Sequence, residues 1–189
     1  MVKLTKIYTR MGDGGRTRLG DMSEALKHDP RVEAYGAVDE ANSAIGLARA
    51  ALSGSQLDAP LQAIQNDLFD VGGDLCVPEK EDLGFEPLRI VDSQVERLER
   101  EIDAHNAHLA PLDSFVLPAG SEAAARLHMA RAITRRAERR VTALMETGAK
   151  VNEAALRYLN RLSDLLFVMA RIANLDAGGD VKWVPGGER

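Results

Sequence analysis

The stretch RLHMARAITRRAERRVTALM, which runs from Arg126 to Met145, decides the fold class of this chain of 189 residues. Small and apolar side chains recur in it at steps of three and four positions, the spacing that places them on one face of an α-helix. We therefore predict a long helix over 121–147, with Gly148 as its stop. Its buried seam is expected to consist of Leu127, Ala130, Thr134, Ala137, Val141 and Leu144.

The same spacing predicts four more helices. Asp29 is a suitable N-cap for the first of them, with Pro30 in its first turn, and Asn152 can cap the last. Gly72 and Gly73 either weaken the end of the second helix or permit close approach of another helix. In order, the predicted helices span 28–52, 61–77, 92–109, 121–147 and 152–176.

Five helices with short connections predict an all-α fold, a five-helix antiparallel bundle of the ferritin-like, up-down kind with an N-terminal glycine-rich loop. We expect a single domain over 1–189, with an arm at 1–27, the helical bundle at 28–176 and a C-terminal tail at 177–189. Only LTKIYT, at positions 4–9, has the pattern of a short extended segment. Trp183, the one tryptophan, is expected to anchor the tail onto this chain or a neighbour.

Composition narrows the function classes. The net charge is −5 and the arginines are interleaved with acidic residues, which argues against general binding to nucleic acid or anionic membranes. The single cysteine, Cys76, rules out an intrachain disulfide and predicts a reducing compartment. The start of the chain lacks an apolar leader segment and no stretch is apolar for the length of a membrane span, so we expect a cytoplasmic protein. The four histidines lack zinc-site spacing, and no metal bound directly by the protein is expected.

The segment YTRMGDGGRT, from Tyr8 to Thr17, is a candidate anion-binding loop. One interpretation is a frayed terminal arm without function. The other is a backbone cradle for phosphate, because successive amides near glycines can form an anion-binding nest. The loop is neither a Walker A motif nor a Rossmann fingerprint, since no G-K-[ST] follows and no strand-then-helix context is evident. Further donors would come from Thr9, Arg10, Arg16 and Thr17.

The long helix carries a second candidate for anion binding. Arg131, Arg135 and Glu138 share one face, next to the apolar seam, while Arg136 and Arg140 point elsewhere. A solvated face of Glu–Arg pairs is the simpler interpretation. Phosphate binding is favoured by the use of arginine, which grips phosphate through paired donors.

Two further polar features point to a site near this face. The last helix has a polar stripe of its own beside its apolar line, which predicts a polar cleft where the two helices meet. Asp39 lies beside the apolar stripe of the first helix, so it either faces solvent or pairs with an arginine of the Arg131–Arg135 face. The polar stripe of the last helix consists of Arg157, Asn160, Arg161 and Asp164.

Five segments in order resemble the PduO-type ATP:cob(I)alamin adenosyltransferases, and together they cover nearly the whole chain. They are YTRMGDGGRT, VDEANSAIG, FVLPAG, RAITRRAERR and NRLSDLLFVMAR. The resemblance implies a homotrimer of five-helix bundles that binds Mg-ATP and a corrinoid between adjacent subunits. It implies transfer of the 5′-deoxyadenosyl group to cobalt with release of triphosphate, and it suggests a reductase and an acceptor enzyme as partners.

The resemblance also implies roles for individual residues. Asp39 and Arg131 would form an ion pair between subunits, and Phe115 would displace the lower axial ligand of cobalamin, so that these residues and Arg135 form the catalytic set. Magnesium would be held through the phosphates of ATP. The implied ATP-binding residues are Thr9, Arg10, Met11, Gly12, Asp13, Gly15, Thr17, Arg18, Lys27, Arg135, Arg136, Ala137, Glu138, Arg139 and Asn160.

One position departs from the family pattern. Many relatives have GDKG or GDDG, whereas Gly14 gives GDGG here, so a phosphate-side lysine is absent. Arg16 compensates for it in our hypothesis. Without the resemblance, Phe115 would be interpreted as an ordinary anchor of its loop in the core.

The implied chemistry suits the residues present. Co(I) is itself a nucleophile, so the protein needs no nucleophile or general base of its own, only groups that align cobalt with C5′ and neutralise the leaving triphosphate. Two other function classes remain as alternatives. One is a helical regulatory or adaptor protein that binds a nucleotide without using it. The other is a helical nucleic-acid binder, which the negative charge and the scarcity of aromatic residues disfavour.

Overall fold

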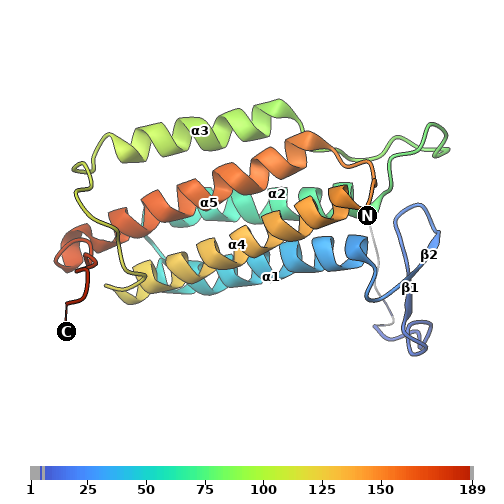
Figure 1. Cartoon of the computed structure of the whole chain (residues 1–189), viewed down its shortest axis with the longest axis horizontal. Helices are drawn as coiled ribbons and strands as arrows, with labels where there is room; N and C mark the ends of the chain where they lie inside the picture. Colours follow the sequence, from blue (N-terminus) through green and yellow to red (C-terminus); the bar gives the residue numbers. More distant parts are fainter. Residues whose placement is uncertain (1–4, 6, 188–189) are drawn as a thin grey trace.

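Five α-helices carry most of the chain, and a small hairpin precedes them (Figure 1). The computed structural model describes residue 5 and residues 7–187. Each helix runs antiparallel to the one before it, which confirms the predicted all-α bundle. The helices are α1 (Pro30–Ala51), α2 (Asp58–Cys76), α3 (Asp92–Asn106), α4 (Glu122–Glu146) and α5 (Glu153–Asn174), followed by the short 3-10 helix η1 (Leu175–Ala177).

Side-chain caps define three of the helix starts. The carboxylate of Asp29 accepts a hydrogen bond from the backbone N–H of Arg31 at 2.8 Å and so caps α1. Ser121 caps α4 and Asn152 caps α5 in the same way, each through a side-chain oxygen. These caps satisfy backbone donors that have no partner within the helix, and they confirm the predicted starts.

The predicted seam of α4 is the centre of the core. All six of its side chains are buried, at 3% exposure or less. α4 packs against α1 on one side and α5 on the other, while α2 packs on α1 and α3 lies along α5. The periodic pattern in the sequence therefore identified the helix around which the bundle assembles.

Some predicted boundaries are wrong. α2 begins at Asp58 rather than at residue 61 and continues through Gly72 and Gly73 to Cys76. A Cβ atom at either glycine would meet nothing within 4 Å, so neither one serves close packing within this chain. α3 ends at Asn106 and α5 at Asn174, earlier than predicted.

The hairpin was not predicted. It consists of β1 (Arg16–Arg18) and β2 (Glu24–Leu26), paired antiparallel with Thr17 opposite Ala25. The segment expected to extend, at 4–9, contains no strand in its described part, and positions 4 and 6 lie outside the described residues. Strands of three residues are too short to show the alternation on which a sequence-based prediction depends.

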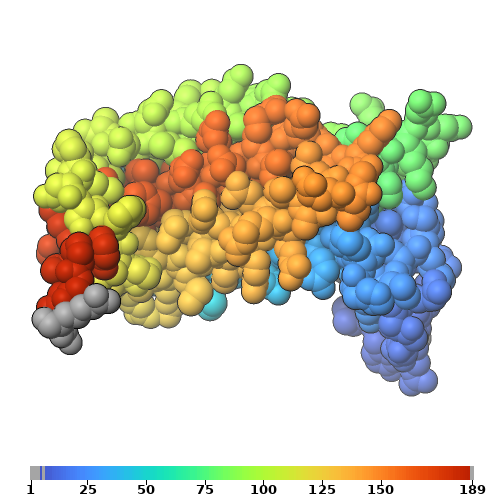
Figure 2. All heavy atoms as spheres, viewed as in Figure 1, coloured from blue at the N-terminus to red at the C-terminus, as the bar shows by residue number. Residues whose placement is uncertain are grey.

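The two ends of the bundle carry different features. The hairpin projects at the end where α1 begins and α4 finishes, and the loop before α4 lies with the C-terminal tail at the opposite end (Figures 1 and 2). α4 has 25 residues, which makes it roughly 37 Å long at 1.5 Å per residue. Among the helices of the described residues, none is long and apolar enough to cross a membrane.

Candidate active site

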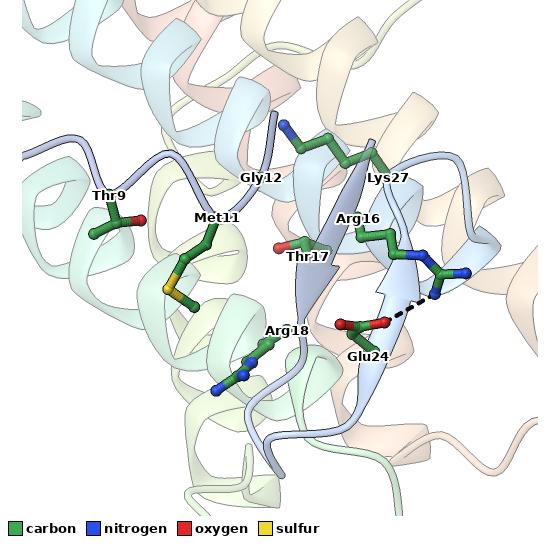
Figure 3. Close-up of a pocket in the computed structure, with 8 residues that line it drawn as sticks. All are labelled: Thr9, Met11, Gly12, Arg16, Thr17, Arg18, Glu24 and Lys27. Atoms are coloured by element: carbon green, nitrogen blue, oxygen red, sulfur yellow. Dashed lines mark hydrogen bonds and ion pairs between the residues drawn. The ribbon is translucent and has the colours of Figure 1, made fainter. Parts of the chain in front are cut away.

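The hairpin and the loop before it enclose a cavity of about 570 Å³ (Figure 3). Its positive charge comes from Arg16, Arg18 and Lys27. Its one carboxylate among the described lining residues, Glu24, pairs with Arg16 at 2.9 Å. The cavity is therefore suited to an anion. The residues that line it are Thr9, Met11, Gly12, Arg16, Thr17, Arg18, Glu24 and Lys27.

The loop is shaped by local turns. The N–H of Gly15 donates to the carbonyl of Gly12 at 3.2 Å, and the N–H of Lys27 donates to the carbonyl of Gly15 at 2.9 Å. Gly15 has a φ of +76°, a conformation that favours glycine, and Arg10 adopts a φ of +63°. Residues 8–27 thus form a defined structure rather than a frayed end.

Gly12 and Gly14 differ in their surroundings. A Cβ atom at Gly12 would lie 3.1 Å from Lys27 Nζ, so the glycine lets the lysine head approach the backbone. A Cβ atom at Gly14 would meet nothing within 4 Å, and its φ is not positive. Position 14 is therefore open to a side chain, and the departure from the family pattern has no steric cause in this chain.

A second groove, of about 290 Å³, continues from the arm between α1 and α4. Lys27 lines both spaces. Arg136 pairs with Glu40 across this groove, and Arg140 Nε lies 3.9 Å from a carboxylate oxygen of Glu33. Arg140, Glu33 and Glu40 were not among the predicted site residues. Only the antiparallel packing of α1 on α4 brings them together, and no local sequence pattern carries that information.

Hydrogen bonds join the polar stripes of α4 and α5, while the predicted cleft between these two helices stays a prediction. Asn160 Nδ2 donates to Glu138 Oε1 at 2.8 Å, and Arg161 Nη1 donates to Asn160 Oδ1 at 2.6 Å. Arg135 and Arg139 are exposed on α4, and neither makes an ion pair with any other described residue. These two guanidinium groups are available to a ligand.

Ala137 differs from the other residues of the predicted ATP-binding block on α4 in its burial. It is fully buried in the core seam. Its methyl group therefore packs between helices, and its assignment to the ATP-binding block stays a prediction.

Asp39 and Arg131 do not pair within this chain. Arg126 donates to the carbonyl of Leu47, and the Glu40–Arg136 pair lies further along the same two helices. This register puts Asp39 next to position 136, and Arg131 lies five positions before that, about 7.5 Å along the helix axis. Asp39 is exposed and makes no salt bridge among the described residues.

Arg131 lacks an anionic partner in the same region. It is half-buried, and its Nε is a buried donor without a hydrogen bond among the described residues. Burial lowers the pKa of Arg131, and the neighbouring Arg135 lowers it further. A half-buried guanidinium with an unsatisfied donor is costly unless an anionic partner meets it.

Phe115 belongs to the loop before α4, which lies at the end of the bundle opposite the hairpin (Figure 1), and it is 77% exposed. Its backbone is fixed by the tail: the N–H of Trp183 donates to the carbonyl of Phe115 at 2.8 Å, and Val116 pairs with Lys182. Since the ring faces outward, it does not anchor the loop in the core. That interpretation of Phe115 was wrong.

His128 was not identified as a notable residue by the sequence. It is 1% exposed, both of its ring nitrogens lack a hydrogen bond among the described residues, and its ring lies 6.0 Å from that of Phe167. Burial lowers the pKa of His128, and the nearby Arg131 lowers it further, against an opposing effect of Asp180. The described residues contain no group of three or more His, Cys, Asp or Glu side chains that could hold a metal.

Comparison with known proteins gives one consistent family. The profile of the cobalamin adenosyltransferase family matches residues 7–173. A corrinoid adenosyltransferase of Mycobacterium tuberculosis is 52% identical over 190 residues, covering 100% of this chain and 97% of the relative. One from Bacillus subtilis is 49% identical, covering 94% and 92%.

Solved structures agree with these relatives. A variant PduO-type ATP:corrinoid adenosyltransferase from Lactobacillus reuteri, complexed with cobalamin and ATP, has a TM-score of 0.88 at 38% identity, covering 94% of this chain and 99% of the other. A second variant from the same organism, complexed with ATP, has a TM-score of 0.87 at 38% identity.

Proposed function

The chain belongs to the cobalamin adenosyltransferase family, and from that premise we propose that it transfers the 5′-deoxyadenosyl group of ATP to the cobalt of cob(I)alamin. The electron pair of Co(I) forms the new bond to C5′, the bond between C5′ and the phosphate oxygen breaks, and triphosphate leaves with that electron pair. The protein has to align the two substrates and stabilise the charge of the leaving group.

The observation that carries this proposal is the position of Lys27. Its side chain lines both the arm cavity and the groove between α1 and α4, so the two spaces adjoin, and each has more cations than carboxylates among its described lining residues. A triphosphate chain that follows them meets Arg18 and Lys27, and it competes with Glu24, Glu40 and Glu33 for Arg16, Arg136 and Arg140. These cations would stabilise the product triphosphate as its charge develops.

We propose that each active site lies between two chains. The arm and Phe115 are at opposite ends of α4, roughly 37 Å apart at 1.5 Å per residue, and one ATP molecule cannot reach both. A neighbouring chain that brings its Phe115 end toward the arm would complete the site. Asp39 and Arg131, which make no ion pair among the described residues, fit such a contact, and the family resemblance favours a homotrimer.

Phe115 is proposed to act on the lower face of the corrinoid. An exposed ring on a fixed backbone can exclude the lower axial ligand of cobalt, which makes Co(II) easier to reduce to Co(I). The reducing electron would come from a partner reductase, and an acceptor enzyme would take up the adenosylcobalamin.

Magnesium is proposed to enter with ATP. Glu24 is the one carboxylate among the described residues lining the arm cavity, and it is already paired with Arg16. The protein residues therefore fit an ion held mainly by phosphate oxygens and water, a mode that suits Mg²⁺. We also propose that 1–189 acts as one adenosyltransferase domain in the cytoplasm, where the free thiol of Cys76 is stable.

The test is a mixture of the protein, Mg-ATP and chemically reduced cobalamin, followed by absorption spectroscopy. The expected product is a light-sensitive alkylcobalamin, formed together with one triphosphate per corrinoid. ATP binding without this product would favour the adaptor function instead. The control variant is Glu96→Gln, which removes one partner of an exposed ion pair on α3, far from the proposed site.

A further inference from the structure

The hairpin of the arm is attached to the bundle at its turn, away from the cavity it carries. The N–H of Gly20, in the turn between β1 and β2, donates to the carbonyl of Cys76 at the end of α2, at 3.0 Å. A Cβ atom at Gly20 would lie 2.5 Å from Val77 Cγ2, so only glycine permits this approach. The turn is therefore built to contact α2.

An ion pair fixes the same turn. Asp21 pairs with Lys80, which lies in the loop after α2, and also accepts a hydrogen bond from the N–H of Ser23 at 3.0 Å. The Asp21 side chain is 5% exposed, whereas that of Lys80 is 51% exposed. The hydrogen bond from Lys80 is the main reason that the pKa of Asp21 falls to about 2, so the carboxylate stays charged at any physiological pH.

Little buried apolar surface holds the hairpin in place. Its two strands have three residues each, and an isolated two-stranded hairpin is marginally stable in water. Its buried apolar side chains are those of Leu19 and Ala25. With so little apolar surface buried, the ion pair at the turn is one of the contacts that set the angle of the hairpin.

We propose that the Asp21–Lys80 pair is a clamp that positions the nucleotide-binding arm. Arg18, which lines the cavity, ends the strand that leads into the turn and is three residues from Asp21. A hairpin released at its turn would pivot at its base, where Lys27 donates to Gly15, and would move Arg18 relative to Lys27. Asp21 and Lys80 are thus positioning residues, and the assignment rests on the proposed function of the arm in ATP binding.

The test uses Lys80→Met, which keeps the length of the side chain, and Asp21→Asn. We expect the dissociation constant for Mg-ATP, measured by calorimetry without turnover, to rise about 5- to 20-fold. The turnover rate at saturating ATP and the melting temperature should stay close to wild type, because the bundle core is untouched. Lys80→Arg should retain wild-type affinity, and Glu96→Gln serves as the matched control.

Limited digestion with trypsin tests the Asp21–Lys80 clamp independently of adenosyl transfer. Loss of the clamp should speed cleavage after Arg16 and Arg18 in Lys80→Met, whether or not the protein turns over ATP. Wild-type cleavage rates in both variants would overturn the clamp. Faster cleavage with unchanged ATP affinity would overturn its positioning role. A wild-type protein that binds ATP but makes no alkylcobalamin would instead contradict the proposed function and leave the affinity comparison valid.

Discussion

The ring of Trp183 meets the ring of Phe115 edge-on, with 5.9 Å between the ring centroids and 66° between the planes. The backbone N–H of Trp183 donates to the carbonyl of Phe115, and the hydroxyl of Ser114 donates to the carbonyl of Trp183. The tail therefore sets both the backbone and the ring orientation of Phe115. We call this ring the wedge, because it is proposed to exclude the lower axial ligand of cobalt. This geometry is typical of a favourable aromatic pair.

Phe115→Ala should slow adenosylation much more when the assay starts from Co(II) than when Co(I) is supplied, because the wedge acts on the reduction step. Trp183→Ala should reproduce this asymmetry more weakly, by roughly 2- to 10-fold, the equivalent of one aromatic contact. The measurement is the initial rate from both oxidation states. Equal losses from both would remove Phe115 from the wedge role.

Arg135→Ala should lower kcat/KM for ATP on the order of 10²-fold, as expected for a donor that stabilises a developing anion. The fold should be intact, since Arg135 is exposed and makes no ion pair among the described residues. Steady-state kinetics and a thermal melt check the two statements. Arg100→Ala, an exposed arginine on α3, is the control; wild-type kinetics for Arg135→Ala would place that residue outside the site.

Asp39→Arg should weaken the assembly, because it would set like charges against each other at the proposed contact with Arg131 of a neighbour. Arg131→Asp alone should do the same. The double variant Asp39→Arg with Arg131→Asp should recover part of the assembly, since the pair is restored in reverse. Sedimentation measures all three, and an unchanged oligomer in each single variant would contradict the contact.

Gly14→Lys should fold normally, because a Cβ atom there meets nothing within 4 Å. The added cation lies beside the proposed phosphate cavity, so we expect ATP affinity to stay equal or to improve by up to roughly 5-fold, about 1 kcal/mol. Gly15→Lys is the contrasting variant, since its φ of +76° disfavours any side chain. Loss of ATP binding in Gly14→Lys would show that the backbone needs a glycine at that position.

His128 should make stability depend on pH. Burial lowers its pKa in the folded state below the ordinary value of 6.5, so between these values the unfolded state binds more protons. The stabilisation is complete above pH 6.5 and is lost as pH falls towards the lowered pKa. Melting at pH 7.5 and pH 5.5 should show a smaller loss in His128→Leu than in wild type, with His108→Gln as control. An equal loss in all three proteins would contradict the assignment.

The helices were predictable because their signals are local. The seam of α4 repeats over several turns, and Asp29, Ser121 and Asn152 cap helices by contacts within a few residues. The meeting of Glu138 with Asn160 also followed from local patterns, since both lie on polar stripes beside neighbouring core seams.

The missed features depend on contacts between distant segments. The hairpin requires Gly20 against Cys76 and Asp21 against Lys80, pairs separated by more than fifty positions in the chain. The exposure of Phe115 depends on the tail more than sixty residues later. No periodicity carries such information, so the arm could be identified from its motif while its hairpin could not.

The separation of the arm from Phe115 along α4 has a genetic consequence. Each complete site would take its phosphate-binding arm from one subunit and its wedge from another. Two mutant copies of the gene, one damaged in the arm and the other at Phe115, would then rescue each other when expressed in the same cell. In a mixed oligomer, one site would combine the intact arm of one subunit with the intact Phe115 of its neighbour. Such intragenic complementation would let a strain with two defective alleles still make adenosylcobalamin.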